Sequence, residues 1–177
     1  RKSYWRIEQQ ALYYFYPKKS KVVNHGFQVY NDNYYDLSFM QIDRLIQPGY
    51  NINFNNTSYL NFRFNNTYTY LKTAFDPTNS GGVRLPDSTG YYYNSGLVQY
   101  QSDWRRKLYF YVSAEYGEYY VGNKTTVAGN INVRTGSWGV FSTGYTVNDI
   151  LMPAPYKSTT LYLLSLRTDI SFSNSLF

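Results

Sequence analysis

Polar and apolar residues alternate along this chain in segments of about ten residues. One face of the clearest segment carries Leu60, Phe62, Phe64, Asn66, Tyr68 and Tyr70. The opposite face carries Asn61, Arg63, Asn65, Thr67 and Thr69. Because successive residues of a strand point to opposite faces, this pattern predicts a strand with one apolar and one polar side.

Similar alternation recurs along the whole chain, whereas no window places apolar residues at the spacing of a helix. The sequence therefore predicts an all-β, antiparallel fold. The third segment is the hardest to place, because residues 33–47 mix both patterns. The predicted strands cover residues 4–16, 22–32, 41–55, 59–72, 91–102, 105–117, 123–134, 138–149 and 159–172.

The connections between these segments suggest how the strands are arranged. Tight turns are predicted at residues 17–20, 55–58, 102–105, 135–137 and 173–175. The connections between them fall at 33–40, 73–90, 118–122 and 150–158. Short and longer connections are thus predicted to alternate strictly. This is typical of an up-and-down transmembrane β-barrel, and a Greek-key sandwich has no reason to show it.

Composition agrees with a sheet that has one uncharged polar face. Aromatic residues reach 21% and charged residues only 16%, against about 25% charged residues in ordinary globular proteins. Cysteine is absent, which excludes a disulfide scaffold and thiolate metal sites. No apolar run approaches the ~18 residues of a spanning helix, so crossing a membrane would require a closed barrel of strands.

Aromatic residues gather at both ends of the predicted strands. Trp104 and Trp138 fall beside short turns, hence at one rim. At the opposite strand ends lie Tyr68, Tyr70, Tyr92 and Tyr116. Trp and Tyr favour the membrane–water boundary, so these residues are candidates for an aromatic girdle. The alternative is that tyrosine simply has a high strand propensity.

The alternation also separates residues expected to face lipid from those expected to face a lumen. An arginine facing lipid at the midplane would cost about 2–4 kcal/mol. The lumen-facing candidates are therefore Arg63, Glu115, Arg167, Asp169, Asn61 and Asn65, with Asn51 and Asn53 on the same wall. The expected lipid-facing residues are Ile52, Phe54, Leu60, Phe62, Phe64, Leu108, Phe110, Val112, Val127, Ile131, Leu164, Leu166 and Ile170.

No constellation of residues indicates catalysis, so we expect no enzyme, cofactor or metal. His25 is the only histidine and shares a face with Phe27 and Val29, where a general base would lack water. Asp76, Asn79 and Asp87 could supply calcium ligands, but the favoured interpretation is that they form turns. The net charge of +6 is spread over many turns without a basic stripe, which argues against nucleic acid.

Basic residues do cluster at the rim of short turns. Lys18, Lys19 and Lys21 flank one turn, and Arg105, Arg106 and Lys107 flank another, with Arg134 beside a third. Two interpretations remain open. These side chains contact lipid phosphates, or they keep the rim soluble.

Several motifs in the second half resemble a known family. They are Phe75-Asp76-Pro77, Leu85-Pro86, Tyr91–Tyr93, Gln101-Ser102-Asp103-Trp104-Arg105-Arg106, Gly117–Gly122, Tyr145–Ile150, Met152-Pro153 and Arg167–Ser173. They resemble uncharacterised Bacteroidota outer-membrane proteins in which a carbohydrate-binding-like β-sandwich (family-9 type) precedes a membrane-associated barrel. The resemblance is best over residues 60–177. It implies an outer-membrane location. The family has no established catalytic residues, so none are carried over to this chain, and the sugar-binding-like domain is not part of these residues.

The sequence therefore predicts one segment of a larger transmembrane barrel over residues 1–177, since nine strands is an odd number and bacterial barrels have even ones. The first functional hypothesis is a pore for small polar solutes. The second is a membrane anchor or scaffold that docks other subunits of a surface complex through loops 73–90 and 150–158. The third, from a different class, is a soluble β-sandwich that binds glycans.

Overall fold

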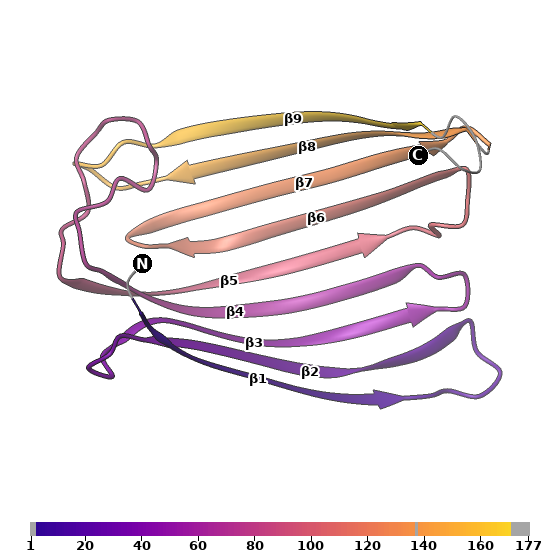
Figure 1. The fold of residues 1–177 in the computed structure, drawn as a ribbon, viewed down its shortest axis with the longest axis horizontal. Coiled ribbons are helices and arrows are strands. Elements are labelled where there is room, and N and C mark those ends of the chain that lie inside the picture. Colours follow the sequence, from indigo (N-terminus) through magenta and orange to yellow (C-terminus); the bar gives the residue numbers. More distant parts are fainter. Residues whose placement is uncertain (1–2, 137, 171–177) are drawn as a thin grey trace.

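The computed structural model describes residues 3–136 and 138–170, and they form one antiparallel sheet (Figure 1). Neighbours in the chain are neighbours in the sheet, from β1 at one edge to β9 at the other. The strands are β1 (Trp5–Phe15), β2 (Val22–Tyr35), β3 (Gln41–Phe54), β4 (Tyr59–Leu71), β5 (Thr89–Gln101), β6 (Leu108–Tyr119), β7 (Gly122–Arg134), β8 (Gly139–Leu151) and β9 (Thr159–Ile170).

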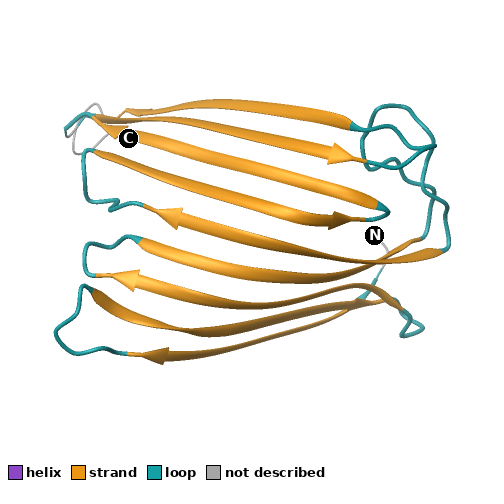
Figure 2. Cartoon of the chain, turned by 180° about the vertical axis from the view of Figure 1, so that it is seen from behind, coloured by secondary structure: helices purple, strands orange, loops and turns teal. Residues whose placement is uncertain are grey.

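This arrangement confirms the all-β, up-and-down prediction and all nine predicted strands. The sheet is open, because β1 pairs only with β2 and β9 only with β8 among the described residues. The predicted end of the last strand and the turn at 173–175 lie outside the described residues. Figure 2 shows the same sheet from behind, with loops at its two ends.

The strand register gives the sheet an apolar face and a polar face. Phe62 of β4 pairs with Tyr50 of β3 and Val98 of β5. One residue earlier, Asn61 pairs with Asn51 and Gln99. The same parity continues into β9, so every residue expected to face lipid lies on the apolar face.

The two faces differ in how much of each side chain is accessible. On β4, Asn61 and Asn65 of the polar face are buried, whereas Phe64 on the apolar face is 50% exposed. The described residues contain no second layer over the apolar face. Tyr91 of β5 and Ile150 of β8, three strands apart on the polar face, nevertheless join one buried cluster. We infer that the sheet bends toward its polar face.

The predicted strict alternation of connection lengths is wrong. All four short turns lie at one end of the sheet, at 16–21, 55–58, 102–107 and 135–138. At the other end, however, only Tyr120 and Val121 separate β6 from β7. Tyr120 adopts a φ of 53°, the left-handed conformation that closes such a tight hairpin. Only 72–88 and 152–158 are long connections at that end (Figure 1).

Residues 33–47 mix two patterns because they span the end of β2, the connection 36–40 and the start of β3. Pro48 is a further irregularity of this third strand. It lies inside β3 and has no N–H to donate to a neighbouring strand. The pairing of β3 with β4 is interrupted between Ile46 and Gly49. At this interruption the Gln47 side chain donates to the Asn65 Oδ1 atom over 2.7 Å. A side-chain hydrogen bond therefore joins the strands where the backbone ladder is broken.

Two of the short turns are joined through Asp103. Its Oδ1 atom accepts hydrogen bonds from the Thr57 hydroxyl at 2.9 Å and from the Arg105 N–H at 3.0 Å. The Arg105 guanidinium lies 3.1 Å from the same oxygen. These donors favour the ionised carboxylate, and they lower the pKa of Asp103 to about 2.

Because its pKa is lowered in the folded state, we predict that Asp103 makes a pH-dependent contribution to stability. A carboxyl whose pKa is lower in the folded state stabilises the protein above its ordinary pKa of 3.8, and this is lost as the pH falls toward 2. We expect Asp103→Asn to unfold at a lower temperature than the parent at neutral pH. The difference between the two unfolding temperatures should shrink below about pH 4. Thermal unfolding measured between neutral and acidic pH gives this difference. Asp87→Asn, at an exposed loop carboxylate, is the control, and a gap that widens with acid would contradict the prediction.

Candidate functional site

The polar face carries a continuous chain of side-chain hydrogen bonds around Arg63. Its Nε atom donates to Asn61 Oδ1 over 3.1 Å, and Asn61 donates to Asn51. Asn51 in turn donates to Gln28 Oε1 over 2.8 Å. This part of the network crosses β4, β3 and β2 through neutral amides, which orient the Arg63 guanidinium.

A second branch links Arg63 to Glu115 across four strands. Arg63 Nη1 donates to Gln47 Oε1 over 3.2 Å, and Gln47 donates to Asn65. Asn65 Nδ2 lies 3.0 Å from Glu115 Oε1, and the Ser95 hydroxyl donates to the same oxygen over 2.6 Å. The structure therefore brings together four of the six lumen candidates, Arg63, Glu115, Asn61 and Asn65.

The remaining two lumen candidates do not join this network. Arg167 and Asp169 share the polar face of β9, where Arg167 Nε lies 2.9 Å from both carboxylate oxygens of Asp169. Both side chains are exposed at the sheet edge. Exposed ion pairs contribute little to stability, so this pair adds a local charge balance and not a structural link.

Residues that the sequence analysis did not single out complete the network. Gln28 and Gln47 are as central to it as the asparagines, and Ser95 holds the carboxylate of Glu115. Their positions in the polar–apolar alternation put them on the same face as Asn51 and Asn65, and this pattern could have identified them from the sequence. The mixed pattern of residues 33–47 hid this alternation for Gln47.

A polar ladder also crosses the apolar face near the end that carries the long loops. Arg44 Nη2 donates to Asn66 Oδ1 over 2.9 Å, and Asn66 donates to Asn94 Oδ1 over 2.8 Å. Asn94 Nδ2 then lies 3.2 Å from Glu118 Oε2. The ladder marks where the apolar band stops. Asn66 was the visible signal, as the one amide within an otherwise apolar series.

The aromatic residues lie at the two ends of the apolar band. Trp104 and Trp138 are half-exposed at the short-turn end. Tyr68 and Tyr92 pair across β4 and β5 with ring centroids 4.5 Å apart, beyond the polar ladder. Tyr116 shares this face and is exposed. Tyr70 lies on the same face of β4, opposite Gly90.

The long loops 72–88 and 152–158 pack against each other, and we call them the loop cap. Leu85 is fully buried and contacts a cluster formed with Met152 and Ile150. Backbone hydrogen bonds join Phe75 and Leu85 in both directions, at 3.1 and 2.7 Å. Around this cluster lie the partly buried rings of Tyr93, Tyr119, Tyr120 and Tyr156. The cap bridges strands that are far apart in the sheet, as Figure 1 shows.

Two of the residues considered for chemistry, Asp76 and His25, have structural partners. Asp76 accepts hydrogen bonds from the backbone N–H groups of Thr78, Ser80 and Gly81, which is a turn-forming role. His25 lies on the apolar face, and its Nδ1 atom lies 2.5 Å from the Tyr50 hydroxyl. Within residues 3–136 and 138–170, no group of three or more metal-ligating side chains occurs.

Together, the fold and the network define a class of protein: within the described residues, a single-layer antiparallel sheet with a hydrogen-bonded polar wall and an uncovered apolar face. No protein-family model, curated protein or solved structure matches this chain. The described part of the chain contains no helix that is long and apolar enough to span a membrane.

Proposed function

We propose that this chain forms part of the wall of a β-barrel in a bacterial outer membrane, with its apolar face against lipid. The observation that carries the proposal is the exposure of that face. Phe64 and Leu164 are 50% and 71% exposed, and no second layer covers them in the described residues. Water-exposed apolar patches on soluble monomers rarely exceed a few hundred Å². Hydrocarbon would cover this face without a second layer.

The ends of the apolar band support the same proposal. Trp104 and Trp138 would lie at one membrane boundary, and Tyr68, Tyr92 and the polar ladder at the other. Aromatic and polar side chains favour these boundaries because part of each group stays hydrated. The resemblance to Bacteroidota outer-membrane proteins favours the same location.

For the barrel's role, we propose passage of small polar solutes along the polar wall. The wall consists mainly of amides, hydroxyls and tyrosines, with the Arg63–Glu115 network at its centre. A lumen lined in this way replaces the hydrogen bonds of a hydrated solute without a strong charge preference. The proposal therefore predicts weak ion selectivity.

The loop cap favours a second candidate, a membrane anchor or scaffold for a surface complex. Loops 72–88 and 152–158 pack against each other through Leu85 and Met152 and bury part of their surface there. A cap that narrows one end of the lumen suits a protein that holds partners and conducts little. The third hypothesis, a soluble glycan-binding sandwich, would need a second sheet over the apolar face.

Spin labels along β6 test the membrane proposal. The chain has no cysteine, so single cysteines can be placed at each position from 109 to 116 in the full-length protein reconstituted in vesicles. Labels at Phe110, Val112 and Ala114 are expected to collide with oxygen dissolved in lipid. Labels at Tyr111 and Ser113 are expected to collide with a water-soluble nickel complex. The alternation follows from the two faces of the strand.

The two sets of positions are each other's controls. Equal access of the nickel complex to both sets would place water on the apolar face and defeat the proposal. Conductance in planar bilayers then separates the two roles. A pore gives discrete channel openings, whereas an anchor with a closed cap gives none.

A further inference from the structure

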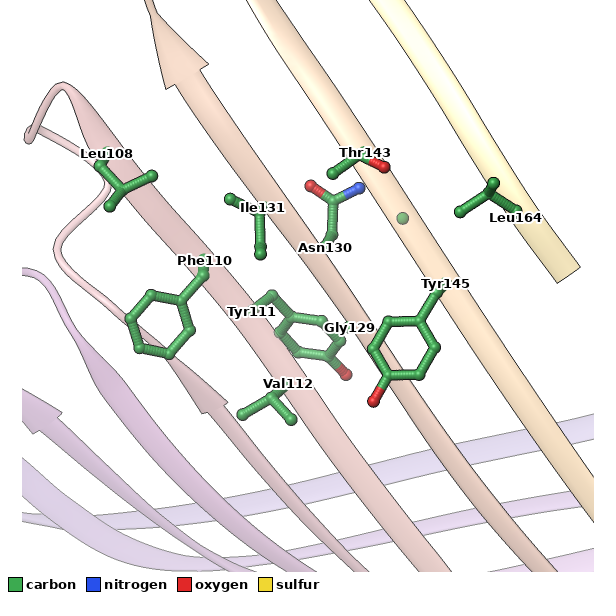
Figure 3. A pocket seen from close by; sticks show the side chains of 11 residues that line it. Leu108, Phe110, Tyr111, Val112, Gly129, Asn130, Ile131, Thr143, Tyr145 and Leu164 are labelled. Carbon is green, nitrogen blue, oxygen red and sulfur yellow. The ribbon is translucent and has the colours of Figure 1, made fainter. Parts of the chain in front are cut away.

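A groove crosses the apolar face above Gly129, between β6 and β9 (Figure 3). It has a volume of about 520 Å³, within the ~300–1,000 Å³ of small-ligand sites. Its floor is open because Gly129 has no side chain. Its walls are formed by Leu108, Phe110, Val112, Ile131, Tyr145 and Leu164. The lining is almost wholly apolar, so the chemistry that suits it is hydrocarbon.

One end of this groove reaches a basic turn. Leu108 begins β6 directly after the turn at 102–107. The turn carries Arg105, Arg106 and Lys107, all exposed. Asp103 is its one carboxylate, 3.1 Å from Arg105 and 3.9 Å from Arg106. The turn therefore keeps a net charge of about +2 next to the apolar groove.

The charge at this end contrasts with the charge at the other. The short turn at 16–21 adds Lys18, Lys19 and Lys21, and it has no carboxylate. In the connections at the opposite end, positive and negative residues balance: Lys72, Arg84 and Lys157 against Asp36, Asp76 and Asp87. Anionic groups are thus attracted to the short-turn end.

We propose that the groove and the turn at 102–107 form a binding site for an anionic phospholipid. An acyl chain lies in the groove above Gly129, and the headgroup phosphate contacts the cations of the turn. This inference rests on the proposed membrane location. Charge complementarity and the continuity of groove and turn at Leu108 argue for this occupant.

A second groove on the same face provides a natural comparison. It lies above Gly96 and has a volume of about 620 Å³. Its lining includes Phe27, Tyr50 and Phe62, and it contains no residue of a short turn. Arg63 is the one cation in its lining, and its guanidinium is bonded to Asn61 and Gln47 on the polar face. No basic turn adjoins this groove, so we expect no preference for anionic lipid there.

Fluorescence quenching at Trp104 tests the proposed site. Trp5→Phe and Trp138→Phe leave Trp104 as the single tryptophan, within the basic turn. The full-length protein is reconstituted in phosphatidylcholine that contains a small fraction of brominated phosphatidylglycerol or brominated phosphatidylcholine. We expect brominated phosphatidylglycerol to quench about fivefold more effectively, because each cation near the surface attracts anionic lipid.

Two triple variants separate a site from general surface charge. Arg105→Gln/Arg106→Gln/Lys107→Gln should abolish the preference for phosphatidylglycerol. Lys18→Gln/Lys19→Gln/Lys21→Gln removes the same number of charges from the same end and should leave the preference intact. Loss of the preference in both variants would show general attraction and overturn the site.

Filling each groove tests the position of the acyl chain. Gly129→Leu should weaken quenching by phosphatidylglycerol, because a Cβ atom there already lies 3.2 Å from the Tyr145 ring and a longer side chain occupies the groove. Gly96→Leu should have no effect, since the space around that position is open. Unchanged quenching in Gly129→Leu would overturn the groove assignment.

The parent protein distinguishes failure of this inference from failure of the proposed function. Equal quenching by the two brominated lipids would overturn the anionic site and leave the membrane location intact. Absence of quenching by either lipid, in protein that does not float with vesicles, would instead defeat the membrane proposal.

Discussion

Val98→Arg is expected to make folding into lipid vesicles less favourable by about 2–4 kcal/mol, the cost of an arginine that faces hydrocarbon near the midplane. Val98 lies on the apolar face of β5, where it pairs with Phe62 and Ala114. It is 43% exposed. If water covered this face, replacing a half-exposed valine by arginine would change stability by less than about 0.5 kcal/mol. Denaturant-dependent folding into vesicles measures the difference.

The neighbouring residue provides the matched control. Gln99 lies on the polar face, and its amide donates to the Tyr111 hydroxyl over 2.7 Å. Gln99→Arg loses this hydrogen bond, at a net cost of about 1 kcal/mol, and places its charge on the side proposed as the lumen. A larger penalty for Gln99→Arg than for Val98→Arg would reverse the assignment of the two faces.

The strands and their faces were predictable from the sequence because they depend on a short-range period of two. Phe62 and Phe64 alternate with Asn61, Arg63 and Asn65 whatever their partners are. Antiparallel pairing then extends the same parity from strand to strand. For the same reason, Trp104 and Trp138 were placed correctly at one end of the sheet.

Features that depend on contacts between distant segments were not predictable in this way. Connection length did not distinguish the two ends of the sheet as predicted. The two-residue hairpin at Tyr120 and Val121 lies at the end that was expected to carry longer loops. Contact between Leu85 and Met152 depends on the bend of the sheet, which no local pattern encodes. The link from Arg63 to Glu115 likewise depends on register across β3 to β6.

The loop cap, which depends on contacts between distant segments, distinguishes the pore from the anchor hypothesis better than the polar wall does. Both roles are compatible with the same polar wall, so the Arg63–Glu115 network does not separate them. The loop cap does, because it lies at one end of that wall, where it would close the proposed lumen. Its stability depends on few residues. The buried hydrophobic cluster of the described residues consists of Leu71, Leu85, Tyr91, Ile150 and Met152.

Leu85→Ala is therefore expected to open the loop cap. Leu85 is the largest fully buried side chain of the described residues, and truncation of a buried leucine to alanine costs about 2–5 kcal/mol. The loop opens locally, so a cost near 3 kcal/mol would raise the open population on the order of 100-fold. Hydrogen exchange of the peptide spanning 72–88 reports this, because the Phe75 and Leu85 N–H groups are protected by their mutual hydrogen bonds.

Val83→Ala is the matched control, since Val83 lies in the same loop and is half-exposed. It should leave the exchange rate nearly unchanged. Unaltered exchange in Leu85→Ala would show that the cluster does not hold the cap. Bilayer recordings on the same variant then complete the test. If the cap closes a lumen, opening it by about 100-fold should produce conductance that the parent lacks. If the parent already conducts and Leu85→Ala changes nothing, the cap lies beside the path of the solute.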